Sequence, residues 1–180
     1  MLFAFHDFET SGLTKHPKAP LEDQPRAIEY ACILHDGKRE VDRLEFICNP
    51  GLIIEEVITK ITGLTNQDLV DKPPFNSFVS DIGEILKSAD IIVAHNQSFD
   101  KAIMEYNLAM VGKSLSDVNW PRLELCTVEQ TFHQFGRYMK LSELYEMFIG
   151  PYEQKHRAAD DVELLIEVAK SIGIFEMFRG

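Results

Sequence analysis

Two acidic residues near the amino terminus lie where a metal site could form. The segment Phe3-Ala-Phe-His-Asp7-Phe-Glu9 alternates as a β-strand does, so its odd-numbered side chains share one face. The carboxylates of Asp7 and Glu9 then lie roughly 7 Å apart at the end of an apolar face. Two acids at the edge of a core are costly unless a cation neutralises them, and hard divalent cations bind carboxylate oxygens. The competing interpretation is a strand whose end frays into solvent.

A second motif, His95-Asn96-Gln-Ser98-Phe99-Asp100, follows a short apolar run and begins a predicted helix. In that position Asp100 faces the ends of the strands, where open α/β sheets bind their ligands. The structural alternative is that Ser98 caps the helix and Asp100 occupies its first turn, where a carboxylate interacts favourably with the helix dipole.

A third motif, His156-Arg-Ala158-Ala-Asp160-Asp161, leads into a helix expected over about 158–171. Apolar residues at 158, 162, 165, 169 and 172 form one stripe on this helix. Asp161 lies beside the stripe, whereas Asp160 falls on the opposite face. We therefore expect Asp161 to point inward near His156 and Asp160 to be solvated. The alternative is a loop histidine followed by ordinary first-turn acids.

The rest of the sequence predicts the elements that position these motifs. Strands are expected at 2–8, 28–34, 43–48, 91–94 and 123–126, and Asp36-Gly37 predicts a hairpin between the second and third. Helical periodicity covers 75–87, 99–110, 127–135, 140–148 and 158–171, and residues 14–25 are expected to form a long loop. This order predicts an α/β fold in which helices flank a mixed five-stranded sheet, built as one domain over 1–180.

Composition limits the kind of protein. The chain has 180 residues, 45% of them hydrophobic and 26% charged, and a net charge of −11. These values indicate a folded globular protein without a broad basic surface for long nucleic acid or an anionic membrane. No apolar run is long enough to cross a bilayer, and the amino terminus lacks the basic region of a signal peptide. The cysteines match no disulfide or zinc spacing, so we expect a cytoplasmic protein; they are Cys32, Cys48 and Cys126.

Taken in order, the three motifs resemble those of the DEDDh branch of 3′–5′ exonucleases, which includes the proofreading (DnaQ-like) exonucleases, ribonuclease T and oligoribonuclease. The family pattern D-x-E-T-x-G-L is present as Asp7-Phe-Glu9-Thr10-Ser-Gly12-Leu13. The patterns H-N-x-x-F-D and H-x-A-x-x-D are present in the second and third motifs. The resemblance extends over nearly the whole chain and implies a ribonuclease H-like exonuclease fold.

The resemblance implies a mechanism and a set of site residues. Two Mg²⁺ or Mn²⁺ ions would be held by Asp7, Glu9, Asp100 and Asp161 and would activate the attacking water, with His156 as general base. The enzyme would remove 5′-mononucleotides from the 3′ end of single-stranded DNA or short RNA. The terminal nucleotide would contact the first two motifs, through Thr10, Gly12, Leu13, His95, Asn96 and Phe99. For Thr10-Ser-Gly12 an ordinary turn is the alternative.

Two departures from the family pattern bear on substrate preference. An insert, from Lys15 to Pro25, follows the first motif, and Cys126-Thr127 stands where Asp-Thr is common. The acidic composition further predicts that the protein contacts only a few phosphates of its substrate. The candidate phosphate contacts are Arg26, Lys101, Arg137, Lys140, Lys155 and Arg157. The alternative for each of them is an ordinary solvated surface charge. Trp120, Tyr138 and Tyr152 are candidate stacking or packing residues.

Two other functions remain open at the level of sequence. One is an oligoribonuclease-like enzyme that degrades very short RNA, since binding a short oligomer requires few contacts along its phosphate backbone. The other is a non-catalytic module on the same fold that binds nucleic acid or protein. The expected partner is the 3′ end of a single-stranded nucleic acid. A second copy of the chain and a replication polymerase are further candidates, and no membrane is expected. The final helix is expected to end about nine residues before Gly180, which argues against a tethering tail.

Overall fold

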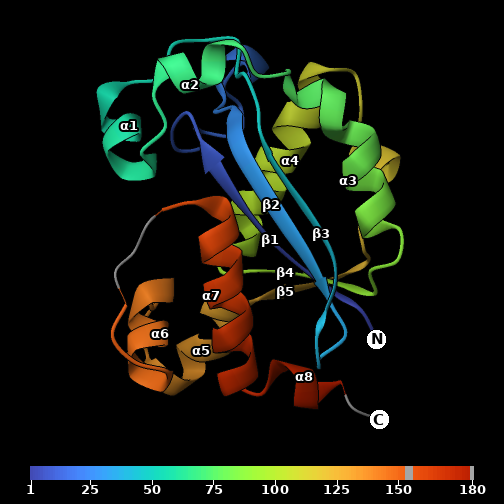
Figure 1. Ribbon diagram of the computed structural model, residues 1–180, viewed down its shortest axis with the longest axis vertical. Helices are drawn as coiled ribbons and strands as arrows, with labels where there is room; N and C mark the ends of the chain where they lie inside the picture. Colours follow the sequence, from blue (N-terminus) through green and yellow to red (C-terminus); the bar gives the residue numbers. More distant parts are fainter. Residues whose placement is uncertain (153–155, 179–180) are drawn as a thin grey trace.

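A mixed sheet of five strands forms the centre of the computed structural model, which describes residues 1–152 and 156–178. The strands are β1 (Phe3–Thr10), β2 (Ala27–His35), β3 (Glu40–Ile47), β4 (Ile91–Ala94) and β5 (Leu123–Cys126). Their spatial order is β3-β2-β1-β4-β5, with β1, β2 and β3 antiparallel and β4 and β5 parallel to β1 (Figure 1). The predicted mixed sheet and the hairpin at Asp36-Gly37 are confirmed.

Helices cover both faces of this sheet. One face carries α3 (Val79–Leu86) and α4 (Gln97–Met110), and the other carries α7 (Ala158–Ser171), as Figure 1 shows. The remaining helices lie beside α7 or at the end of the long strands; they are α1 (Glu56–Thr62), α2 (Asn66–Val70), α5 (Thr127–Phe135), α6 (Leu141–Phe148) and α8 (Ile174–Met177). No helix of the described residues combines the length and apolarity that a bilayer span requires.

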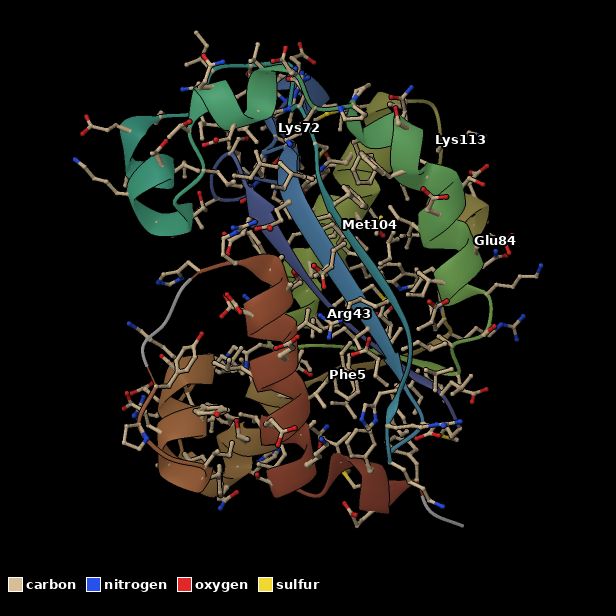
Figure 2. The ribbon with its side chains drawn as sticks, viewed as in Figure 1. Phe5, Arg43, Lys72, Glu84, Met104 and Lys113 are labelled. Atoms are coloured by element: carbon tan, nitrogen blue, oxygen red, sulfur yellow. The ribbon has the colours of Figure 1, made fainter. Side chains whose placement is uncertain are left out.

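The alternation in β1 distributes its side chains between the two faces. Phe3 and Phe5 pack against α7, whereas Ala4 and Phe8 belong to the core under α3 and α4. In Figure 2, Phe5 lies on the α7 side of the sheet and Met104 on the α3 side. The pairing of β1 with β2 continues to Thr10, so the strand does not fray at its acidic end.

Some predicted helices differ in detail. The segment expected as one helix over 75–87 begins with a 3₁₀ turn, Phe75–Phe78, and becomes α-helical only at Val79. The ring of Phe78 stacks on Phe46 at 4.0 Å, and this contact with β3 fixes the start of the helix. In α4 the fully buried positions include Ile103, Met104 and Leu108, whereas Tyr106 and Met110 are half-buried.

The end of α7 also differs from expectation, because a short helix follows it. Gly173 adopts a left-handed φ of 77°, which turns the chain into α8. Phe175 of α8 then packs edge-on against Phe3 at 5.0 Å. A four-residue helix carries too little periodicity to be found from sequence. Its residues Ile174 and Phe175 are buried in the core on the α7 face.

The insert after the first motif is a long loop, as predicted, and it contains a 3₁₀ turn at Leu21–Asp23. Gln24 is 2% exposed, and its side chain anchors the loop from inside. The Gln24 Oε1 accepts from the Lys15 amide at 3.0 Å, and its Nε2 donates to the His16 carbonyl at 3.1 Å. This anchor gives the insert a defined course beside the first motif.

Candidate active site

The three motifs meet at the carboxyl end of β1 and β4. The cleft formed there has a volume of about 860 Å³. Asp7 enters it from β1, Asp100 from the first turn of α4, and Asp161 from the first turn of α7; His156 lies just before α7. The lining also includes His95, Asn96, Ser98, Phe99, Tyr138, Met139 and Lys140.

Asp100 is held against β1 by a backbone contact. Its Oδ1 accepts from the Phe8 amide at 3.2 Å, and the residue is 3% exposed. Burial raises the pKa of the Asp100 carboxyl to about 8, although the bond from Phe8 favours the charged form. The residue at the cap of α4 is Asn96, and Ser98 bonds to the Asn96 side chain, so the alternative in which Ser98 caps the helix is wrong.

Glu9, His156 and Asp161 form a compact group. Each offers one ligand atom, and these atoms lie within 4.8 Å of one another. Asp161 is 8% exposed, and within the described part of the chain its Oδ1 is buried without a hydrogen-bond partner. Asp160 is half-buried, more enclosed than the solvated position predicted for it. The inward direction of Asp161 agrees with the stripe of apolar residues on α7.

Burial and neighbouring negative charges raise the pKa of the acids in the cleft. Burial, then the negative charges of Asp161 and its neighbours, raises the pKa of Glu9 to about 8. Burial and the charge of Asp160 raise the pKa of Asp161 to about 6. Burial, followed by repulsion from Asp100 and Glu9, raises the pKa of Asp7 well above its usual range. Such a cluster, with an unpartnered buried oxygen, fits a divalent cation that would neutralise it.

A further buried acid, Glu29 on β2, was not among the predicted site residues. It is 6% exposed and lies directly opposite Glu9 in the β1–β2 pairing. Arg157, which follows His156, binds its carboxylate, with Nη2 to Oε1 at 2.6 Å and Nε to Oε2 at 3.0 Å. The sequence does carry a signal for Glu29: it is the one acid in a strand that is apolar except for Glu29 and the terminal His35.

Among the predicted substrate residues, His95 is held by the protein. Its Nε2 lies 2.9 Å from the Met139 carbonyl, which can only accept, so Nε2 carries the proton. Its Nδ1 then accepts from the Thr127 hydroxyl at 2.9 Å. Burial lowers the pKa of His95, in keeping with a neutral ring. The imidazole thus links β4, α5 and the segment before α6; contact between His95 and substrate stays a prediction.

The loop after β1 leaves open space beside the insert. The Thr10 hydroxyl donates to the Gly12 carbonyl at 2.7 Å, so a local turn is present here. Apart from its chain neighbours, no atom of the described residues lies within 4 Å of where a Cβ at Gly12 would stand. Leu13 is 83% exposed. These positions are free for a ligand.

Most of the basic residues predicted to contact phosphates form ion pairs or hydrogen bonds within the protein. Lys101 pairs with Glu124, Arg137 with Glu143 and Arg157 with Glu29, and Arg26 donates to the Pro50 carbonyl. Lys140 lines the cleft, and Lys155 lies outside the described residues. Trp120 donates to Glu124, whereas Tyr138 is 70% exposed, packs on Phe132 and lines the cleft.

The fold and the site define a class of protein: a carboxylate-lined nuclease on a ribonuclease H-like sheet. The exonuclease family model, RNase_T, matches residues 4–169, and the chain belongs to this family with the motifs of its DEDDh branch. The family assignment makes the domain a phosphodiester hydrolase that cuts from chain ends.

Known relatives agree with this assignment. The DNA polymerase III subunit epsilon of Treponema pallidum is 29% identical over 168 residues, which cover 92% of this chain and 74% of the relative. The 3′–5′ exonuclease DinG of Bacillus subtilis is 31% identical over 165 residues, covering 90% of this chain and 16% of the relative. Among solved structures, E. coli ExoI in complex with ssDNA superposes with a TM-score of 0.79 at 20% identity, covering 96% of this chain and 40% of that one. The chain therefore spans well under two thirds of the length of DinG and of ExoI.

Proposed function

We propose that this chain is a metal-dependent 3′–5′ exonuclease that removes 5′-mononucleotides from the 3′ end of single-stranded DNA or short RNA. The observation that carries the proposal is the convergence of five side chains at one end of the sheet. Carboxylates from β1, α4 and α7 surround the same space as the imidazole of His156. They come from three segments that are far apart in the sequence.

The acids fit two Mg²⁺ or Mn²⁺ ions, with Asp7, Glu9, Asp100 and Asp161 as the residues that would hold them. When bound, such ions supply Lewis acidity to water and to the scissile phosphate and stabilise the developing negative charge. Burial raises the pKa of both Glu9 and Asp100 to about 8, and neighbouring carboxylates add to the shift of Glu9, which expresses the cost of holding these groups charged in a partly buried space. A cationic ligand removes this cost.

His156 is proposed as the general base. It lies at the edge of the cleft beside Glu9 and Asp161 and before the first turn of α7. Imidazole is suited to accept a proton from water near neutral pH.

The terminal nucleotide is proposed to lie against the loop after β1. The open space in front of Gly12 permits a close approach of backbone and ligand, and exposed Leu13 offers an apolar surface to a base. Asn96 and Phe99 contribute the opposite side of the cleft. The domain is proposed to span 1–180 and to act in the cytoplasm, alone, as a homodimer or beside a polymerase. Action beside a polymerase is supported by the similarity to a DNA polymerase III subunit epsilon.

An oligoribonuclease-like activity is the second candidate. Net charge is −11, and three of the cationic candidates are paired with acids. A surface of this kind attracts long polyanions poorly, whereas an oligomer of a few nucleotides needs few contacts.

The test uses matched DNA and RNA oligomers of three to about 20 nucleotides, labelled at the 5′ end. With Mg²⁺ we expect ladders that shorten from the 3′ end and release 5′-mononucleotides, and EDTA should abolish them. Asp7→Asn, purified in the same way, controls for a contaminating nuclease. Full activity in EDTA or in Asp7→Asn would contradict the proposal. Degradation confined to the shortest RNA would select the oligoribonuclease alternative.

A further inference from the structure

The reaction proposed above gives no role to the ion pair between Glu29 and Arg157. Glu29 lies opposite Glu9 on neighbouring antiparallel strands, so the two side chains share a face. Like charges in that position repel. An acid that is 6% exposed beside four others must therefore be held by a specific partner, and Arg157 is that partner.

The contacts of Glu29 use both carboxylate oxygens. Oε1 accepts from Arg157 Nη2 at 2.6 Å and from Nε at 3.1 Å. Oε2 accepts from Nε at 3.0 Å and from the Ala158 amide at 3.2 Å. Ala158 is the first residue of α7, so the carboxylate also satisfies a free amide at the helix start, where negative charge is favoured.

The pair holds the backbone on which the third motif depends. His156, immediately before Arg157, has a left-handed φ of 49°, a conformation that residues with a Cβ adopt only where the surroundings impose it. The Arg157 carbonyl accepts from the Asp161 amide at 2.9 Å and so begins the helical bonding that carries Asp161. Arg157 therefore connects the two functional residues of the motif to β2.

We infer that Glu29 and Arg157 are positioning residues: together they fix the imidazole of His156 and the carboxylate of Asp161 relative to Glu9. The inference rests on the proposed function, in which those three side chains act on one phosphate. A guanidinium–carboxylate pair with two parallel contacts allows only one relative orientation. A displacement of about 1 Å at a reacting group can cost about 100-fold in rate. By this inference the guanidinium of Arg157 binds Glu29 and does not contact a phosphate of the substrate.

The experiment compares variants at both ends of the pair. Arg157→Ala removes the guanidinium, and Arg157→Lys keeps the charge but loses the two-point contact. Glu29→Gln keeps the shape of the side chain but replaces one acceptor oxygen by an amide nitrogen. That nitrogen faces a donor of Arg157 or Ala158, so a hydrogen bond and the negative charge are lost. The control is Arg43→Ala. Arg43, labelled in Figure 2, also links the sheet to α7, through Glu163 at 2.9 Å, but it lies away from the cleft.

Two measurements are made on each variant. Steady-state kinetics on a short oligonucleotide with saturating Mg²⁺ separates kcat from KM. The ¹H–¹³C signal of the His156 ring, assigned by its absence in His156→Gln, reports the position of the imidazole in the metal-free protein. Circular dichroism and thermal melts record whether each variant is folded at the assay temperature.

The inference predicts that kcat falls by about 100-fold in Arg157→Ala and Glu29→Gln while KM changes by less than about threefold. Arg157→Lys should recover part of the loss, the double variant should lose no more than either single one, and Arg43→Ala should behave as wild type. The His156 signal should move in the pair variants and not in the control.

Other results would overturn the inference. An increase in KM at unchanged kcat would make Arg157 a phosphate contact. An unchanged kcat with an unmoved His156 signal, or loss of folding in both Glu29→Gln and Arg157→Lys, would reduce the pair to a structural role. If the wild-type protein shows no metal-dependent activity, the proposed function fails instead, and the His156 signal still decides whether the pair positions the ring.

Discussion

Asp160 and Asp161 are adjacent, yet the start of α7 gives them different surroundings. Asp161 is 8% exposed and lies beside Glu9 and His156, whereas Asp160 is half-buried and does not belong to that group. Asp161→Asn should lower kcat by more than about 100-fold, because it removes a charge that the metal site requires. Asp160→Asn should keep most of the activity.

The measurement for this pair is kcat at saturating Mg²⁺, accompanied by urea unfolding in EDTA. Metal-free Asp161→Asn should be at least as stable as wild type, since the substitution removes one of several repelling charges. A larger loss of activity in Asp160→Asn than in Asp161→Asn would contradict the assignment of the inward acid.

The role of His156 can be separated from metal binding. His156→Ala should lose on the order of 10²–10⁴-fold in kcat if the ring is the general base. Because the ring lies within 4.8 Å of ligand atoms of Glu9 and Asp161, Mn²⁺ affinity should be measured by calorimetry on the same variant. We expect this affinity to change little, and exposed His133→Ala serves as the control. Loss of Mn²⁺ binding would make His156 a ligand instead of a base.

At the scale of elements, the insert depends on one buried side chain. Gln24→Ala leaves the Lys15 amide and the His16 carbonyl without their partner, so the free energy of unfolding should fall by about 1–2 kcal/mol. Trypsin should cut the loosened loop at Lys15 and Lys18 faster than in wild type. Urea titration and a digestion time course measure the two effects.

The exposed glutamine of α5 provides the control, Gln134→Ala, which should change neither stability nor digestion. In Gln24→Ala, KM should rise more than kcat falls, since the insert adjoins Leu13 and not His156. An insert that stays resistant to trypsin would show that other contacts define its course.

At the scale of the whole molecule, metal-free stability should depend on pH. Glu9 and Asp100 have pKa values raised to about 8 in the folded state, so the folded protein binds more protons than the unfolded chain up to that pH. The free energy of unfolding should therefore fall as pH rises. Below about 6.5 the histidines oppose this trend, because burial lowers the pKa of His6 to about 4 and also lowers those of His35 and His95.

Between pH 6.5 and 8 we expect the free energy of unfolding in EDTA to fall by about 3 kcal/mol, to which Glu9 and Asp100 contribute roughly equally. Urea unfolding at several pH values measures it. Mg²⁺ should reverse the trend, since binding releases protons from the acids. Asp100→Asn should flatten the EDTA profile, and a wild-type profile that rises across this window would contradict the electrostatic description of the cleft.

Net charge also predicts how the protein holds nucleic acid. With a charge of −11, binding depends on the metal site and a few cationic groups. For two to four neutralised phosphates, the slope of log K against log salt should be roughly −1.5 to −3. Affinity should level off beyond about four to six nucleotides. Fluorescence anisotropy with Ca²⁺ in place of Mg²⁺ measures both, and a slope steeper than about −5 would reveal a basic track.

Several features of this protein are local properties of the chain and were readable from it. The alternation in β1 placed Asp7 and Glu9 on one face, and the 3.6-residue period of α7 separated Asp161 from Asp160. The Asp36-Gly37 turn set the β2–β3 hairpin. Each of these depends on residues a few positions apart, so a periodic pattern is enough to reveal it.

Other features depend on contacts between distant segments, and only the tertiary structure decided them. Glu29 and Arg157 are 128 residues apart, and His95 is held by Thr127 and Met139, which are 32 and 44 residues away. The break before α3 follows from the stacking of Phe78 on Phe46. No local period encodes such pairs, because they form only when the sheet brings β2, β4 and the helix starts to one edge. The residues that carry the chemistry could therefore be predicted from the sequence, whereas the contacts that hold them in place depend on the packing of distant segments.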